Sequence, residues 1–91
     1  MNTVEEVRRI VNTTPPGQVI TYGEIAALVG ITPRRAGRLV ADLDESSPWW
    51  RVVYQDGSTA TCHGGVAGSL LAAEGTPLRG DRVDIGRTRA P

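Results

Sequence analysis

The sequence predicts a mainly α-helical domain with a small β-hairpin, arranged as a winged helix-turn-helix. Three observations predict this fold. Two short helical segments are joined by a tight turn that contains Gly30, and the second segment carries arginines on its outer face. An Asp-Gly pair at 56–57 lies between two extended runs, which is the pattern of a hairpin and hence of a wing. The length of 91 residues predicts a single winged-helix-like domain over residues 1–91.

Composition narrows the classes of function. The chain is 40% hydrophobic and 22% charged, which is ordinary for a globular protein. No apolar run is long enough to span a bilayer, and residues 1–13 lack a signal-peptide core, so we predict a cytoplasmic location and no membrane partner. Cys62 is the only cysteine, which excludes an internal disulfide and a cysteine-rich zinc site. Together with the single histidine it offers too few metal ligands, so no metal and no cofactor are predicted.

The distribution of charge is more informative than the net charge of zero, which by itself argues against a nucleic-acid partner. All ten cationic side chains are arginine, a preference that codon usage alone could produce. Arg34, Arg35 and Arg38 nevertheless cluster in a stretch without any acidic residue between Glu24 and Asp42. Every amphipathic surface helix has a charged face, but clustering of one sign favours DNA binding.

The first predicted helix covers roughly residues 4–12. Residues 3–6 have the sequence of a capping box, in which the Thr3 hydroxyl and the Glu6 carboxylate satisfy each other's backbone donors. Apolar residues then recur at helical spacing and form one stripe: Val4, Val7, Ile10 and Val11. The Pro-Pro-Gly sequence at 15–17 ends the helix in a turn.

The helix-turn-helix is predicted from two sets of capping signals. A capping box from Thr21 to Glu24 opens a helix that runs to Val29, and Gly30 is placed to cap its C-terminus. Thr32 caps the next helix, and Pro33 fits its first position. This third helix, roughly 33–43, has an apolar face opposite the three arginines, and that face comprises Ala36, Leu39, Val40 and Leu43.

The remainder of the chain predicts the wing and a short tail. Two extended runs, 51–54 and 58–61, flank the Asp-Gly turn, and a glycine-containing loop follows at 62–65. A short fourth helix over 66–73 is closed by Gly75. Within 76–91 we expect a short strand near residues 78 and 83–85, followed by a loose tail. Both tryptophans, Trp49 and Trp50, precede the wing, and the simplest interpretation is that they pack in the core.

The order and spacing of these segments resemble a known family. The chain is similar, over roughly residues 4–75, to the DNA-binding, active-site domain of O6-alkylguanine-DNA alkyltransferases, and more closely to the alkyltransferase-like proteins. The segments that carry the resemblance are 15–26 (Pro-Pro-Gly-Gln-Val-Ile-Thr-Tyr-Gly-Glu-Ile-Ala), the arginine-bearing helix, 48–53 (Pro-Trp-Trp-Arg-Val-Val), 56–57 and 70–75 (Leu-Leu-Ala-Ala-Glu-Gly).

The resemblance implies that this chain does not transfer alkyl groups. In the alkyltransferases the segment that matches Pro48 to Arg51 reads Pro-Cys-His-Arg, in which the cysteine accepts the alkyl group and the histidine acts as its base through water. Trp49 occupies the cysteine position and Trp50 the histidine position, and no indole forms a thiolate or transfers protons at neutral pH. The alkyltransferase-like proteins usually keep that histidine, so Trp50 is a further departure. Cys62 beside His63 is an alternative nucleophile, although adjacent side chains usually diverge.

The resemblance also implies roles for individual residues. Tyr22 matches a tyrosine that presses on the 3′ phosphate of the target nucleotide and helps to rotate its base out, or else serves as a partly buried anchor. Arg38 best matches the arginine that enters the duplex, with Arg35 as the alternative. Trp49 is expected at the floor of the base pocket, while Trp50 packs inward. The residues that match the loop over the extruded base are Thr61, Cys62, His63, Gly64 and Gly65, and those with a structural role in the motif are Pro48, Trp50 and Arg51.

The function implied is recognition without repair. The expected partner is double-stranded DNA that carries O6-alkylguanine, which a monomer would bind, flip out and mark for nucleotide excision repair proteins. One alternative is a winged-helix DNA-binding or regulatory module without lesion specificity. A second alternative is an alkyltransferase that uses Cys62 as its nucleophile.

Overall fold

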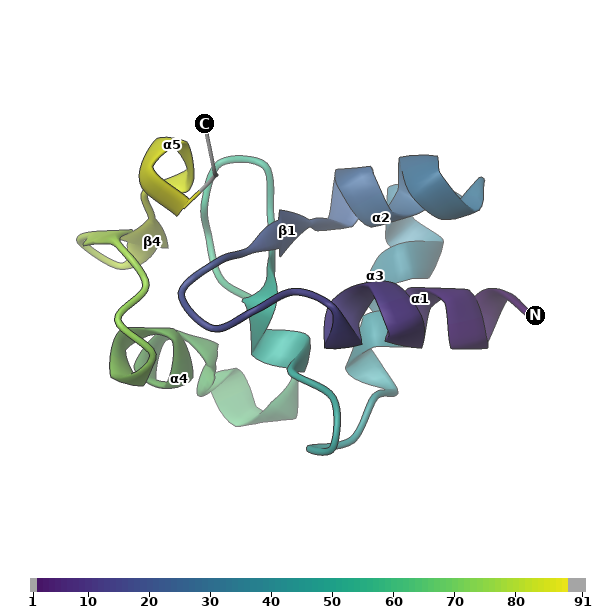
Figure 1. The fold of residues 1–91 in the computed structure, drawn as a ribbon, viewed down its shortest axis with the longest axis horizontal. Helices are drawn as coiled ribbons and strands as arrows, with labels where there is room; N and C mark the ends of the chain where they lie inside the picture. The colour runs from purple at the N-terminus through teal and green to yellow at the C-terminus, as the bar shows by residue number, and fades with distance from the viewer. Residues whose placement is uncertain (1, 89–91) are drawn as a thin grey trace.

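Three helices form the N-terminal half of the molecule. The structure is a computed structural model that describes residues 2–88 (Figure 1). Helices α1 (Thr3–Asn12), α2 (Tyr22–Val29) and α3 (Pro33–Ala41) pack against one another. Their apolar faces form most of the main core, to which Val7, Val11, Ile25, Ala26, Ala36 and Val40 contribute. Within residues 2–88, no helix has the length and apolar character needed to cross a membrane.

The helix-turn-helix follows the predicted capping signals. Thr21 and Glu24 form the complete capping box of α2, with the Glu24 amide donating to the Thr21 hydroxyl over 3.1 Å. Gly30 ends the helix at a φ of +83°, in the left-handed region where glycine has no steric penalty. Thr32 then caps α3 by accepting from the Arg35 amide over 3.1 Å. These features of the prediction are confirmed.

Two details of the N-terminal half differ from the prediction. The cap of α1 is Asn2, whose side chain accepts a 2.9 Å hydrogen bond from the Glu5 amide, so the capping box predicted from Thr3 to Glu6 is wrong. An asparagine is an even better cap than a threonine, and it lies one residue earlier. Helix α3 ends at Ala41, two residues before the predicted end, although Leu43 is still buried.

The first sheet is parallel, which no local sequence signal indicated. Strand β1 (Ile20–Thr21) pairs with β2 (Val52–Val53), so that Ile20 lies opposite Val52 and Thr21 opposite Val53. This pairing attaches the start of α2 directly to the start of the wing. The residue that follows each paired strand is a tyrosine, Tyr22 in one case and Tyr54 in the other.

The predicted hairpin is reduced to a tight turn. The Gly57 amide donates to the Tyr54 carbonyl and the Tyr54 amide donates to the Ser58 carbonyl, each over 2.9 Å. Beyond this turn only an isolated bridge joins Val53 to Thr59. Arg51 was predicted in the first arm, but it belongs to the 3₁₀-helix η1 (Trp49–Arg51), because its amide bonds back to Pro48 over 3.1 Å.

The C-terminal part contains more regular structure than predicted. A second 3₁₀ segment, η2 (His63–Gly65), precedes helix α4 (Ala67–Ala73). Strands β3 (Leu78–Arg79) and β4 (Arg82–Val83) form an antiparallel hairpin where one short strand was expected. Helix α5 (Ile85–Thr88) follows, so the prediction of Ile85 in a strand is wrong. The loose tail was expected for the last few residues, of which 89–91 lie outside the described residues.

The β3–β4 hairpin holds the wing turn, residues 54–57, from one side (Figure 1). The Val83 amide donates to the Gly57 carbonyl over 2.8 Å, and Arg82 lies 3.8 Å from the Asp56 carboxylate. Gly57 has a φ of +87°, and a Cβ added there would lie 2.3 Å from the Val83 carbonyl oxygen. Only a glycine therefore lets the turn and the hairpin approach this closely.

Candidate nucleic-acid interface

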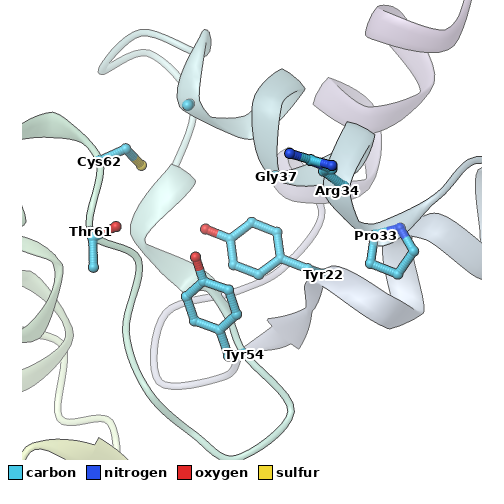
Figure 2. Close-up of a pocket in the computed structure, with 8 residues that line it drawn as sticks. Tyr22, Pro33, Arg34, Gly37, Tyr54, Thr61 and Cys62 are labelled. Carbon is cyan, nitrogen blue, oxygen red and sulfur yellow. The ribbon is translucent and has the colours of Figure 1, made fainter.

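A cavity of about 450 Å³ lies between α3, the first residue of α2 and the wing (Figure 2). We call it the Tyr22 cavity. The chain segments that form it come from four parts of the sequence. Its lining residues are Tyr22, Pro33, Arg34, Gly37, Ala41, Tyr54, Thr61 and Cys62.

Tyr22 is placed by two constraints on its backbone. It follows directly after the capping residue Thr21, and Thr21 is paired with Val53 of the wing. The side chain is 6% exposed, and in Figure 2 its hydroxyl points toward the side of the cavity that Thr61 and Cys62 form. Burial, with smaller contributions from Cys62 and Tyr54, raises the pKa of Tyr22, so the phenol stays protonated and can donate a hydrogen bond.

The three arginines of α3 are all exposed, but they do not occupy equivalent places. Arg34 lines the Tyr22 cavity. A separate shallow hollow of about 170 Å³ is lined by Thr32 and all three arginines. Arg35 and Arg38 thus line the shallow hollow but not the Tyr22 cavity, whereas Arg34 lines both. Gly37, one turn after Arg34, faces the Tyr22 ring, and a Cβ there would lie 3.9 Å from two ring carbons.

Trp49 lies in the core and away from the Tyr22 cavity. Its side chain is 2% exposed, and its ring stacks on His63 with centroids 4.0 Å apart and planes at 15°. The His63 Nε2 lies 2.7 Å from the Leu43 carbonyl oxygen, which fixes the imidazole over the indole. Trp50 is half-buried and meets Trp49 edge-on at 5.7 Å. Trp49, Trp50 and His63 line a second cavity of about 320 Å³.

Residues of the segment from Thr61 to Gly65 contribute to both cavities. Thr61 and Cys62 line the Tyr22 cavity, whereas His63 lines the second one. His63, Gly64 and Gly65 all have left-handed backbones, with φ values of +55°, +79° and +72°. No atom lies within 4 Å of a Cβ added at either glycine, so the backbone conformation and not the packing requires glycine here.

The surroundings of Cys62 disfavour a thiolate. Burial raises the pKa of the Cys62 thiol, so the neutral form prevails at physiological pH. The neighbouring imidazole is held by Trp49 and the Leu43 carbonyl. In the part of the chain that the structure describes, no group of three His, Cys, Asp or Glu side chains is placed to hold a metal ion.

Arg51 joins three distant segments beneath the interface. Its Nε donates to both carboxylate oxygens of Glu74 over 3.1 Å, and its Nη1 donates to the Thr14 carbonyl over 2.8 Å. Both side chains of the Arg51–Glu74 ion pair are largely buried. Pro48 precedes this arginine as the residue before η1. The ion pair therefore anchors η1, and with it Trp49, to the end of α4, and the hydrogen bond to Thr14 anchors it to the loop after α1.

The Arg51–Glu74 pair predicts how stability depends on pH. Partial burial alone would raise the pKa of Glu74, but the hydrogen bonds and charge of Arg51, with a contribution from the Trp50 side chain, outweigh it and lower the pKa. A carboxyl with a lowered folded-state pKa stabilises the fold above its unfolded pKa of about 4.3, and this stabilisation is lost as the pH falls through the folded value. Glu74→Gln is expected to cost about 1–3 kcal/mol of unfolding free energy at pH 7.

The same substitution should flatten the decline in stability between about pH 5 and pH 3. Urea unfolding of both proteins at a series of pH values measures this, with Glu45→Gln at an exposed glutamate as the control. An unchanged acid slope in the Glu74 variant would show that the pair does not contribute to acid sensitivity.

Sequence reasoning missed Tyr54 as a residue of the site. Its ring packs against Tyr22 with centroids 4.8 Å apart and planes at 44°. The only sequence signal is that each tyrosine follows a pair of extended residues, at 20–21 and 52–53. That signal has meaning only when the parallel pairing of the two strands is known.

Comparison with known proteins identifies close relatives. The family model of the 6-O-methylguanine DNA methyltransferase DNA-binding domain matches residues 2–76. A DNA base-flipping protein of Escherichia coli (strain K12) is 36% identical over 93 residues, which cover 93% of this chain and 71% of that protein. A DNA base-flipping protein of Vibrio parahaemolyticus (serotype O3:K6, strain AQ3810) is 36% identical over 56 residues. That alignment covers 57% of this chain and just over half, 56%, of the Vibrio protein.

Two solved structures of an S. pombe protein share the fold. The crystal structure of S. pombe Atl1 in complex with damaged DNA containing O6-carboxymethylguanine has a TM-score of 0.80 at 24% identity, and the match covers 98% of this chain and 94% of that one. The crystal structure of S. pombe ATL in complex with DNA has a TM-score of 0.81 at 25% identity, over 97% and 94% of the two chains. The winged helix-turn-helix predicted from the sequence is thereby confirmed as the fold.

Proposed function

The chain belongs to the family of the 6-O-methylguanine DNA methyltransferase DNA-binding domain, and from this premise we propose that it recognises O6-alkylguanine in duplex DNA by flipping the damaged base out of the helix. The observation that carries the proposal is the Tyr22 cavity, which lies directly beside the arginine face of α3. The E. coli and Vibrio relatives are named DNA base-flipping proteins, and S. pombe Atl1 has been crystallised with alkylated DNA, which supports the same role here.

The energetics of flipping suit this arrangement. Removing a base from the stack costs roughly a few kcal/mol, and the cost is lowest for a damaged or weakly paired base. A protonated Tyr22 hydroxyl and the backbone of the Thr61–Cys62 segment offer polar contacts within the cavity, and Arg34 adds a positive charge to its lining. Exposed arginines on α3 would neutralise phosphates, and this contribution is independent of sequence and falls as salt rises.

We further propose that the lesion is bound but not repaired by this chain. Trp49 stands at the position that the resemblance assigns to the alkyl-accepting cysteine, and its indole is buried under His63. Cys62 lines the Tyr22 cavity, but its raised pKa leaves the thiol neutral and weakly nucleophilic. A repair function would then require other proteins, and we propose that nucleotide excision repair proteins act on the marked site. The sequence further predicts that the protein acts as a monomer, that it forms a single DNA-binding domain and that it is located in the cytoplasm.

The proposal is tested by titrating two matched duplexes that differ only in one guanine, unmodified or O6-methylated. We expect tighter binding of the methylated duplex, measured by fluorescence anisotropy of a labelled strand. Equal affinities at several salt concentrations would instead identify a winged-helix DNA-binding module without lesion specificity.

The absence of alkyl transfer is tested by mass spectrometry after incubation with the methylated duplex. We expect the protein mass to stay unchanged and the lesion to persist in the DNA. An added methyl group on Cys62 would contradict the proposal and identify an alkyltransferase with a relocated nucleophile.

A further inference from the structure

Tyr54 stands beside Tyr22 because of the register of the parallel sheet. Strands β1 and β2 pair Thr21 with Val53, so the next residues along the two chains meet as neighbours. Their rings pack at a centroid distance of 4.8 Å, and Figure 2 shows both hydroxyls directed to the same side of the cavity. A shift of one residue in this register would separate the two rings.

The two tyrosines differ in exposure. Tyr22 is 6% exposed, whereas Tyr54 is 45% exposed. Both tyrosine rings and Pro33 line the Tyr22 cavity. The same three residues also line an adjoining hollow of about 660 Å³, distinct from those described above, which extends toward Gln55 and Ile85. Tyr54 is therefore a large aromatic surface at the mouth of the cavity, supported from behind by Tyr22.

The backbone of Tyr54 is fixed at both of its hydrogen-bonding groups. Its amide donates to the Ser58 carbonyl and its carbonyl accepts from the Gly57 amide, each over 2.9 Å. The β3–β4 hairpin holds this turn in place, because the Val83 amide donates to the Gly57 carbonyl over 2.8 Å. An exposed aromatic ring on a rigid backbone loses little conformational entropy when it binds a flat apolar partner.

We propose that Tyr54 is a stacking platform for the extruded nucleobase of the bound DNA. This inference rests on the proposed base flipping and adds a residue that the family motifs do not include. The face of an unpaired base is flat and π-rich, and stacking on an aromatic side chain is tolerant of base identity. The cavity places an incoming base between the Tyr54 ring and the Thr61–Cys62 segment, while Tyr22 holds the ring upright.

The test compares Tyr54→Ala and Tyr54→Phe in titrations of the O6-methylguanine duplex. We expect the alanine variant to bind roughly tenfold more weakly or worse, since stacking supplies that much per base, and the phenylalanine variant to bind as the wild type does. Leu28→Ala removes an apolar side chain that is 68% exposed on α2 and serves as the matched control. Thermal melting of each variant confirms that it is folded.

Two further duplexes identify which base stacks on Tyr54. With an abasic site opposite the lesion, the effect of Tyr54→Ala should persist, whereas with an abasic site in place of the lesion it should disappear. The opposite pattern would assign the platform to the orphaned partner base and overturn the proposal.

Other outcomes separate this inference from the proposed function. Wild-type affinity in Tyr54→Ala, or equal weakening in Tyr54→Phe, would overturn the stacking role while the lesion preference of the wild type stands. A wild-type protein without lesion preference would refute the proposed function itself.

Discussion

Replacing Gly57 with alanine is expected to cost about 3 kcal/mol or more of unfolding free energy, the largest loss among the glycine-to-alanine substitutions of this chain. The added Cβ would lie 2.3 Å from the Val83 carbonyl oxygen, at a backbone φ of +87°. The obstacle is a backbone atom and not the end of a flexible side chain, so the wing turn and the β3–β4 hairpin would have to separate.

Gly80→Ala provides the matched control for this prediction. Gly80 also has a left-handed backbone, with a φ of +66°, but no atom lies within 4 Å of its added Cβ. We expect it to cost only about 1–2 kcal/mol, which is the conformational penalty alone. Urea unfolding curves of the two variants measure the difference. Equal losses would mean that the hairpin yields without cost and does not hold the wing.

Arg34→Ala is expected to reduce the ratio of affinities for the methylated and the unmodified duplex by roughly tenfold or more. This expectation holds if Arg34 is the arginine that fills the space left in the duplex by the flipped base. The family resemblance favoured Arg38 for this role, with Arg35 as the alternative. The structure adds a geometric argument for Arg34, which is the only one of the three that lines the Tyr22 cavity.

Arg35→Ala and Arg38→Ala are the controls for the Arg34 prediction. If Arg35 and Arg38 contact phosphates, each substitution should weaken binding of the methylated and the unmodified duplex alike. Each should also lower, by about 1, the slope of the logarithm of the binding constant against the logarithm of the salt concentration. The fluorescent base 2-aminopurine, placed beside the lesion, reports base flipping directly, because its emission depends on stacking with the neighbouring base. If lesion preference is lost in Arg38→Ala and kept in Arg34→Ala, the assignment from the family motif is correct.

The helix-turn-helix could be predicted from the sequence because its signals are local. The capping box from Thr21 to Glu24, the left-handed Gly30 and the cap at Thr32 each act within four residues. The buried face of α3 could be predicted from the helical spacing of its apolar residues, and Ala36 and Val40 are fully buried as predicted. Signals of this kind act between neighbouring residues, so they can be recognised without knowing the tertiary contacts that stabilise such short helices.

The parts that could not be predicted depend on contacts between distant segments. The parallel pairing of Ile20 with Val52 spans 32 positions, and the strands are only two residues long, so no hydrophobic alternation reveals them. Tyr54 was missed for the same reason. The family resemblance implied Trp49 at the floor of the base pocket, whereas in the structure Trp49 stacks on His63 and the two line a different cavity from the one that Tyr22 lines.

The bonds of Arg51 carry a kinetic consequence. They join positions separated by 37 and 23 residues, so each bond can form only after the entropy of closing its own loop has been overcome. We expect the helices to nucleate first and contacts of this range to form after the transition state, and such late contacts act mainly by slowing unfolding. Glu74→Gln should therefore shorten the lifetime of the folded state far more than it slows refolding.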